Sequence, residues 1–266
     1  MSRSDDVRVR DRSPLPLIVI GLVAGLFSGL FGVGGGTVIL PLLVLWLGFD
    51  QRLGAGTSLA AIVPAASIGV ISYAVTDAVA WLPALVLAVG AAIGAQVGTA
   101  LLPRISQQAL RWGFVAFLVV VIVGLFLVVP TRGSGFDLGW GSGLGLGGLG
   151  LLTGVVSGLI GVGGGVIIVP ALMFAFGMSD LVARGTSLLV MIPTAASGLL
   201  GNLRRRNVDL RAAAFVGVSA CTTTALGAWL ATRIDPFVGN LLFAGYLALI
   251  AVQMSARALT ERRRRR

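Results

Sequence analysis

The chain has 266 residues, of which 56% are hydrophobic and only 11% are charged. Soluble domains carry about 25% charged residues, so this composition excludes an ordinary soluble fold and predicts an all-α polytopic membrane protein. All 20 basic residues are arginine, and the net charge is +10. Because the arginines gather at the termini and between apolar stretches, they indicate membrane orientation, and we expect no nucleic-acid partner.

The chain offers little chemistry for catalysis. It contains one cysteine, Cys221, and neither histidine nor lysine. A disulfide within the chain and a cysteine-based zinc site are therefore excluded, and the usual nucleophile and base pairs of an enzyme cannot be assembled. The Gly-x-Gly pieces lack the preceding strand of a dinucleotide fingerprint. We expect neither an enzyme nor a cofactor.

In chain order, a basic tail, 1–14, precedes an apolar stretch that begins at Leu15. Basic residues before an apolar run are typical of a signal peptide. Here the apolar stretch continues past Leu47 without a cleavage site, which favours a first membrane segment.

Eight apolar segments follow one another, with boundaries good to about three residues. Most have the approximately 20 residues needed to cross a hydrocarbon core. The first and fifth are too long for one simple crossing, and each contains a Gly-Val-Gly-Gly-Gly run. The segments are 15–47, 54–76, 82–102, 112–130, 142–177, 184–203, 212–231 and 236–256.

The two halves of the chain repeat each other at an offset of 129 residues. Residues 21–105 align without a gap on 150–234, with roughly a third of the positions identical. We therefore expect two homologous four-segment repeats, the first segment of each broken at its glycine run. The expected units are a basic cytoplasmic tail (1–14), the first transmembrane repeat (15–130), a glycine-rich linker (131–149), the second transmembrane repeat (150–257) and an arginine-rich cytoplasmic tail (258–266).

The glycine runs lie at Gly32–Gly36 and Gly161–Gly165, and Pro41 and Pro170 follow them at equal spacing. Glycine and proline are the residues that a membrane helix holds least comfortably. Interruptions at corresponding positions of two halves are typical of the binding site of a transporter. We therefore expect the function at these two breaks.

A longer pattern surrounds each glycine run. Gly25-Leu26-Phe27-Ser28-Gly29-Leu30-Phe31 leads into the first run, and Gly56-Thr57-Ser58-Leu59 follows Pro41. The second half has counterparts at 154–165, Pro170 and 185–188. This paired pattern resembles the TauE/SafE family of sulfite exporters over nearly the whole chain. The resemblance implies a transporter of sulfite, sulfonates or related small sulfur-containing organic anions in the plasma membrane of a prokaryote, without identifying the substrate.

The breaks suit an anion on physical grounds. Backbone N–H and C=O groups exposed to lipid cost several kcal/mol each unless they are hydrogen-bonded. A break in a membrane helix must therefore face protein or a water-filled cavity. The helices restarting near Thr37 and Val166 point free N–H groups and their positive dipole ends at the breaks. Close helix packing is the alternative use of glycine, and we expect it for the spaced sets Gly25/Gly29, Gly154/Gly158 and Gly90/Gly94/Gly98.

The candidate substrate site combines the break glycines with hydroxyls and one cation. The hydroxyls of the two Gly-Thr-Ser sequences either donate to the ligand or satisfy helix carbonyls. Arg184, which stands where the first half has Ala55, either attracts the anion at a cavity mouth or extends to the lipid surface. The candidate residues are Gly34, Gly35, Gly36, Thr37, Thr57, Ser58, Gly163, Gly164, Gly165, Arg184, Thr186 and Ser187.

The acidic residues bear on energy coupling. All ten lie in tails or near segment ends, whereas proton-coupled pumps usually place titratable groups along the path. We therefore expect a uniporter or facilitator, or a weakly acidic substrate that carries its own proton. Asp77 and Asp209 are the only expected candidates for coupling.

Two topologies fit the arginine positions. In one, all eight segments cross once. In the other, the first and fifth segments are hairpins turning at the glycine runs, so that each half crosses three times and the second repeat is inverted. Both place both termini in the cytoplasm. We favour the inverted version, because segments of about 30 residues interrupted by glycines are awkward single spans.

An anion channel and a non-transporting membrane scaffold are the rival functions. Saturable uptake would favour a carrier. Ohmic conductance would favour a channel, and the absence of flux would favour a scaffold. The expected partners are a small anion and the membrane lipids, whose anionic headgroups attract Arg262–Arg266. The sequence leaves a homo-oligomer open.

Overall fold

The computed structural model describes residues 14–101, 140–264 and scattered positions between 112 and 123. The fourth expected segment, 112–130, and the first part of the expected linker lie largely outside the described residues. Every regular element within the described ranges is an α-helix, which confirms the all-helical class. The helices are α2 (Pro14–Phe31), α3 (Gly36–Leu45), α4 (Gln51–Ala74), α5 (Trp81–Leu101), α7 (Trp140–Ile160), α8 (Gly165–Phe176), α9 (Asp180–Arg204), α10 (Leu210–Arg233) and α11 (Pro236–Arg264).

Seven of the described helices are long and apolar enough to cross a membrane. The exceptions are α3 and α8, with 10 and 12 residues. At about 1.5 Å per residue, each of these reaches only about half of a 30 Å hydrocarbon core. Each short helix follows a long one, α2 or α7, across a glycine-rich turn.

Aspartates fix where two of the long helices begin. The Asp50 carboxylate accepts a hydrogen bond from the N–H of Arg52 at 3.0 Å, and that of Asp209 accepts from the N–H of Ala212 at 2.9 Å. Each satisfies a donor that a helix start leaves free. Because of these caps, α4 and α10 begin two or three residues earlier than their apolar segments predict.

Helices from opposite halves approach very closely because glycine faces the partner's backbone. A Cβ on Gly25 of α2 would lie 2.1 Å from the carbonyl oxygen of Ala220 on α10. A Cβ on Gly154 of α7 would lie 2.1 Å from the carbonyl oxygen of Ala91 on α5. Helix α2 therefore pairs with α10, and α5 with α7. The same geometry confirms the packing role expected for all the spaced sets: Gly25/Gly29, Gly154/Gly158 and Gly90/Gly94/Gly98.

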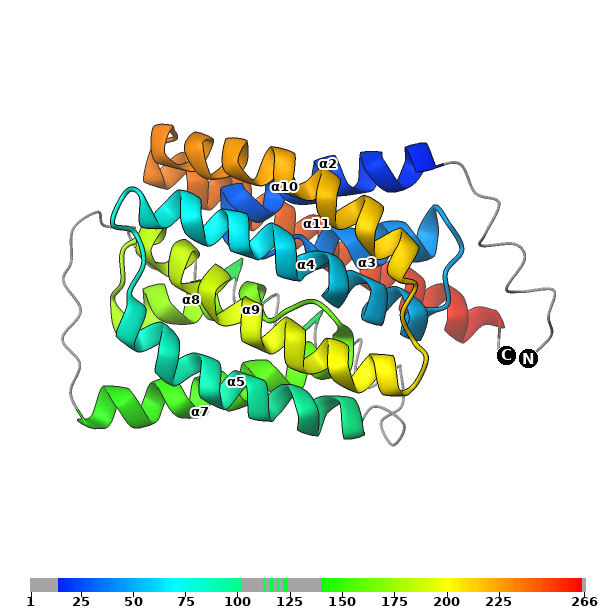
Figure 1. The fold of residues 1–266 in the computed structure, drawn as a ribbon, viewed down its shortest axis with the longest axis horizontal. Coiled ribbons are helices and arrows are strands. Elements are labelled where there is room, and N and C mark those ends of the chain that lie inside the picture. The colour runs from blue at the N-terminus through cyan, green and yellow to red at the C-terminus, as the bar shows by residue number, and fades with distance from the viewer. Residues whose placement is uncertain are drawn as a thin grey trace.

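Helices α4 and α9 lie against each other in the middle of the bundle and run in opposite directions (Figure 1). Gly69, late in α4, faces Leu188, early in α9, whereas Leu59, early in α4, faces Gly198, late in α9. Helix α2 begins and α11 ends at the same end of the bundle (Figure 1). The central pair α4 and α9 carries the residues that contact both glycine-rich turns.

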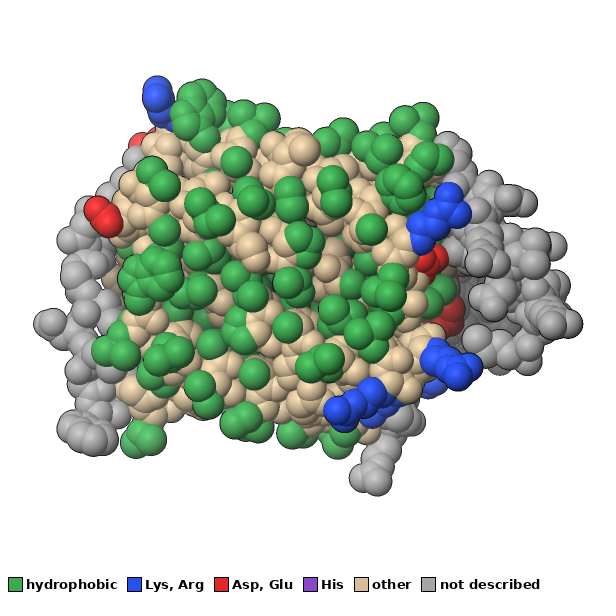
Figure 2. All heavy atoms as spheres, in the orientation of Figure 1, with side chains coloured by type: hydrophobic (Ala, Val, Ile, Leu, Met, Phe, Trp, Pro, Cys, Tyr) green, Lys and Arg blue, Asp and Glu red, His purple; other side chains and the backbone are tan. Residues whose placement is uncertain are grey.

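The outer surface is apolar between two charged ends. Figure 2 shows hydrophobic side chains across the middle of the visible face, with arginines and acids at its two ends. Leu85 and Val89 of α5 are 63% and 58% exposed, which suits lipid rather than water. Trp46, Trp81 and Trp229 lie at or near helix ends and are exposed, as in the aromatic belts of membrane proteins. The surface is that of a multi-pass membrane protein.

Two expected boundaries differ from the structure. Helix α7 begins at Trp140, so residues 140–149, assigned to the linker, are helical. A Cβ on Gly143, Gly147 or Gly148 would meet no atom within 4 Å, whereas a Cβ on Gly90 of α5 would lie 2.5 Å from the carbonyl oxygen of Gly147. Helix α11 continues to Arg264, so most of the expected tail, 258–266, is helical as well.

Candidate functional site

The chain turns sharply between α2 and α3, at a segment we call the first break (32–36). Gly32, Gly34 and Gly35 have φ of +69°, +69° and +71°. This left-handed backbone costs a residue with a Cβ about 1–2 kcal/mol, which explains the glycines. Between α7 and α8 lies the second break (161–165), whose φ values at the equivalent glycines are +80°, +82° and +84°.

Most amides of the two breaks are left without a backbone acceptor. The N–H groups of Gly32 and Gly161 donate to the carbonyls of Ser28 and Ser157 at 2.9 and 2.7 Å. No carbonyl among the described residues accepts from the next three glycine amides of either break, and the helix-capping residue offers no side-chain bond. These amides belong to Gly34, Gly35 and Gly36 in the first break and to Gly163, Gly164 and Gly165 in the second. All six residues are buried.

The two breaks lie against each other in the protein interior. A Cβ on Gly36 would lie 2.7 Å from the carbonyl oxygen of Val162, and one on Gly165 would lie 2.8 Å from the α-carbon of Val33. The side chain of Met191, from α9, lies beside both breaks, since its Cε would be 2.1 Å and 2.3 Å from a Cβ on Gly34 and Gly163. Two helix starts with free N–H groups are therefore brought together at one buried point.

The three candidate threonines bond within the protein. Thr57 on α4 accepts from the N–H of Asp209 at 3.0 Å, and Thr186 on α9 accepts from the N–H of Ala80 at 2.9 Å. These bonds tie the central helices to the starts of α10 and α5. Thr37 bonds to the hydroxyl of Tyr246 on α11. The oxygens of Thr57 and Thr186 accept from backbone N–H groups, so these contacts show neither of the two uses expected for the hydroxyls, donation to the ligand or to a helix carbonyl.

Four buried serines differ from the threonines. The candidates Ser58 and Ser187 are fully buried, and their hydroxyls have no hydrogen-bond partner among the described residues. The same holds for Ser28 and Ser157, which are 0% and 1% exposed and which sequence reasoning missed. The available signal was their equivalence at the 129-residue offset, since each precedes its glycine run by the same distance.

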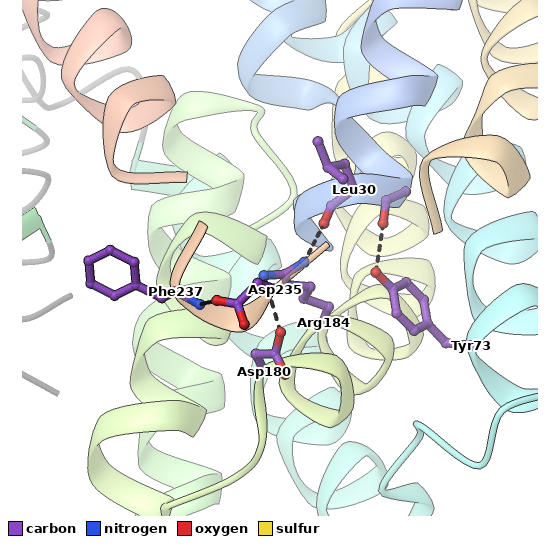
Figure 3. A network of polar contacts seen from close by, with 7 residues as sticks. Leu30, Tyr73, Asp180, Arg184, Asp235 and Phe237 are labelled. Atoms are coloured by element: carbon purple, nitrogen blue, oxygen red, sulfur yellow. Dashed lines mark hydrogen bonds and ion pairs between the residues drawn. The ribbon is translucent and has the colours of Figure 1, made fainter. Parts of the chain in front are cut away.

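Arg184 lies neither at a cavity mouth nor at the lipid surface, contrary to both expectations. It is 3% exposed, and its Nη1 donates to the carbonyl of Leu30 at 2.8 Å. Its Nη2 lies 3.5 Å from a carboxylate oxygen of Asp180. Figure 3 shows the guanidinium between these two groups, with the Tyr73 hydroxyl donating to the neighbouring carbonyl of Gly29. Arg184 and Tyr73 thus satisfy carbonyls in the last turn of α2, the negative end of its dipole.

The structure also corrects the account of the acidic residues. Asp180 is only 1% exposed and forms a buried ion pair, although it is the first residue of α9. Asp77 is exposed in the turn after α4, and Asp209 caps α10. Of Asp77, Asp180 and Asp209, Asp180 is therefore the buried one, and the backbone of its partner Arg184 lies against Gly32 of the first break. The burial of Asp180 could not be predicted from the sequence, because a residue at the end of a helix is usually exposed to water.

Many membrane transporters have broken helices whose ends meet near the middle of an apolar bundle. The family described as Sulfite exporter TauE/SafE matches residues 2–125 and 146–266. The chain belongs to the TauE/SafE family. It is therefore a membrane transporter, as the resemblance of its paired motifs implied.

Relatives of this TauE/SafE protein carry matching names. A probable membrane transporter protein of Xylella fastidiosa (strain Temecula1) is 32% identical over 81% of this chain and 84% of its own length. The probable membrane transporter protein YunE of Bacillus subtilis is 24% identical over 73% of this chain and 79% of its own. Sulfite exporter TauE/SafE family protein 1 of Arabidopsis thaliana is 28% identical over 48% of this chain and 28% of its own. No solved structure matches the chain.

Proposed function

We propose that this TauE/SafE protein carries small oxyanions, such as sulfite and sulfonates, across the plasma membrane of a prokaryote and holds them at the two breaks. One observation carries the proposal: two helix starts with free, buried N–H groups face each other at the centre of the bundle. A buried amide without an acceptor costs about 1–3 kcal/mol, so these groups call for a ligand or water. The positive ends of both helix dipoles favour an anion.

The arrangement of the halves supports alternating access. The starts of α3, α4 and α5 at Gly36, Gln51 and Trp81 are each 129 residues before those of α8, α9 and α10. The equivalent helices α4 and α9 run antiparallel, and the pairing of α2 with α10 corresponds to that of α7 with α5. We propose that the halves are inverted repeats, each broken at its glycine run, and that they rock about the shared site.

Closure of the site favours a carrier over a channel. Met191 and the backbone of the opposite break fill the space beside the glycines in this conformation. An anion can enter only if these groups move, and a thioether side chain moves readily. We propose that both termini face the cytoplasm, because most arginines then lie inside.

The test is flux in proteoliposomes containing purified protein. Sulfite, sulfate, thiosulfate, taurine and sulfoacetate are offered one at a time, with empty liposomes as control. The proposal predicts saturable uptake of at least one anion, with competition by its analogues. Current that rises linearly with voltage without saturation would indicate a channel, and absence of flux for the whole panel would indicate a scaffold.

A further inference from the structure

Resting on the proposed function, we infer that Ser28, Ser58, Ser157 and Ser187 are substrate-binding residues, two at each break, and that they select a three-oxygen sulfonate-type head group. The hydroxyls of these four serines would complete the donor set begun by the backbone amides.

Serines in membrane helices usually donate to a carbonyl one turn earlier. Ser67 and Ser72 on α4 do so, bonding to the carbonyls of Val63 and Ile68 at 2.9 Å each. Ser219 on α10 bonds to Phe215 in the same way, at 2.6 Å. The four inferred serines make no such bond, although they are more deeply buried than Ser67 and Ser72. Leaving a buried hydroxyl unpaired costs about 1–3 kcal/mol, and the cost is incurred four times.

The positions of Ser157 and Ser58 place both at the second break. Ser157 lies on the last turn of α7, and its Cβ is 3.7 Å from where a Cβ of Gly164 would stand. Ser58 lies on α4 between Ala55 and Ile62, at spacings of three and four residues that share one helix face. Ala55 lies against Gly161, and Ile62 lies against Gly163 as well as against Gly34 and Gly36, so this face of α4 covers the second break and reaches the first.

Ser28 and Ser187 occupy the matching positions at the first break. Ser28 lies on the last turn of α2, and its carbonyl accepts from the N–H of Gly32. Ser187 lies on α9 between Arg184, whose backbone packs against Gly32, and Met191, whose side chain packs against both Gly34 and Gly163. Each break thus has one unpaired hydroxyl from the helix that enters it and one from the helix that crosses it.

The donor set indicates the head group. Each break offers three glycine amides without a backbone acceptor and two unpaired hydroxyls, none of them charged. A sulfonate or sulfite has three oxygens that can receive these donors, whereas a carboxylate has two and would leave buried donors unpaired. Sites built to hydrogen-bond a group reject analogues that lack it. Methanesulfonate should therefore compete for transport at least about tenfold better than acetate.

The decisive experiment combines kinetics with stability. Ser28→Ala and Ser157→Ala are compared with Ser67→Ala and Ser72→Ala, whose hydroxyls are already satisfied. Loss of one hydrogen bond to an anion should raise the KM for the carried anion about tenfold or more in the first pair and leave it unchanged in the controls. Without substrate, the first pair should melt at the wild-type temperature or above, because an unpaired buried hydroxyl has been removed.

The outcomes separate this inference from the proposed function. Wild-type protein that transports none of the panel overturns the proposed function. Wild-type flux with unaltered KM in Ser28→Ala and Ser157→Ala overturns only the serine assignment, as does a lower melting temperature without substrate, which would show a structural role. If a variant transports too slowly for kinetics, the rise in melting temperature caused by sulfite in detergent replaces KM, and an unchanged rise overturns the assignment.

Discussion

At the scale of single residues, the ion pair of Asp180 and Arg184 distinguishes the two breaks. The guanidinium satisfies the carbonyl of Leu30 at the end of α2, but Ala55 stands at the equivalent position facing the end of α7. An ion pair therefore reinforces the first break, whereas the equivalent positions at the second, Gln51 and Ala55, carry no charge. Because both partners are nearly inaccessible, the network is held in a low-dielectric interior where removal of one charge is costly.

Arg184→Met should destabilise the protein strongly. The substitution keeps much of the side-chain volume but leaves the Asp180 carboxylate buried without its cation, at a cost of about 3–5 kcal/mol. The double variant Arg184→Met with Asp180→Asn should recover most of the loss, since no charge is then buried alone. Thermal unfolding in detergent measures both. A single variant as stable as the wild type would show that the pair contributes nothing.

The hydrogen-bond partners of the four serines and of Arg184 could not be predicted from the sequence. Glycine, with its positive φ, could be placed at the breaks because few other residues tolerate that backbone. The fate of a hydroxyl or a guanidinium depends on which helix faces it. Ser58 and Thr57 are neighbours in sequence, yet one is unpaired and the other bonds to Asp209. Only the arrangement of α4, α9 and α10 decides this.

At the scale of elements, glycine has two separable uses in this chain. Glycines on α2, α5 and α7 let helices touch, whereas those of the breaks let the backbone turn and leave amides free. Spacing by four residues predicted the first use, and runs of adjacent glycines predicted the turn. Helix ends were less predictable, since residues 140–149 were expected to belong to a linker and instead form the glycine-rich start of α7.

Substitution at a packing glycine should affect stability. Gly154→Val would place its side chain against the backbone of Ala91, and overpacking of this kind costs about 1–3 kcal/mol. Gly148→Ala, on the same helix with no atom within 4 Å of the new Cβ, is the matched control. Melting temperature and yield of folded protein should fall for the first and hold for the second. Equal behaviour of the two would contradict the tight α5–α7 contact.

At the scale of the whole molecule, the direction of the helices bears on the two topologies left open by the sequence, of which we propose the inverted one. Helices α4 and α9 are antiparallel, and α3 and α8 are too short to cross. Both features agree with hairpins at the breaks and an inverted second half. The positions of the arginines could not distinguish the two topologies, because both topologies place most arginines on one side of the membrane.

Accessibility of introduced cysteines tests the topology. In a Cys221→Ser background, Arg52→Cys near the start of α4 and Thr76→Cys after its end are both at exposed positions. Hairpins at the breaks put Arg52→Cys on the cytoplasmic side and Thr76→Cys outside. A membrane-impermeant thiol reagent added to whole cells should therefore label only Thr76→Cys. Labelling of Arg52→Cys alone would instead support eight single crossings.

We propose that the backbone amides of the breaks hold the anion, and the variant Gly164→Ala probes these amides. Its new methyl group would meet no atom closer than 3.4 Å, so the bundle should fold, but the φ of +84° is unfavourable for alanine and the methyl would stand beside the start of α8. The measurement is sulfite-dependent stabilisation and flux of Gly164→Ala beside Gly148→Ala. If the amides hold the anion, sulfite-dependent stabilisation and flux should both be lost in Gly164→Ala and retained in Gly148→Ala. Wild-type flux and stabilisation in Gly164→Ala would contradict binding by these amides.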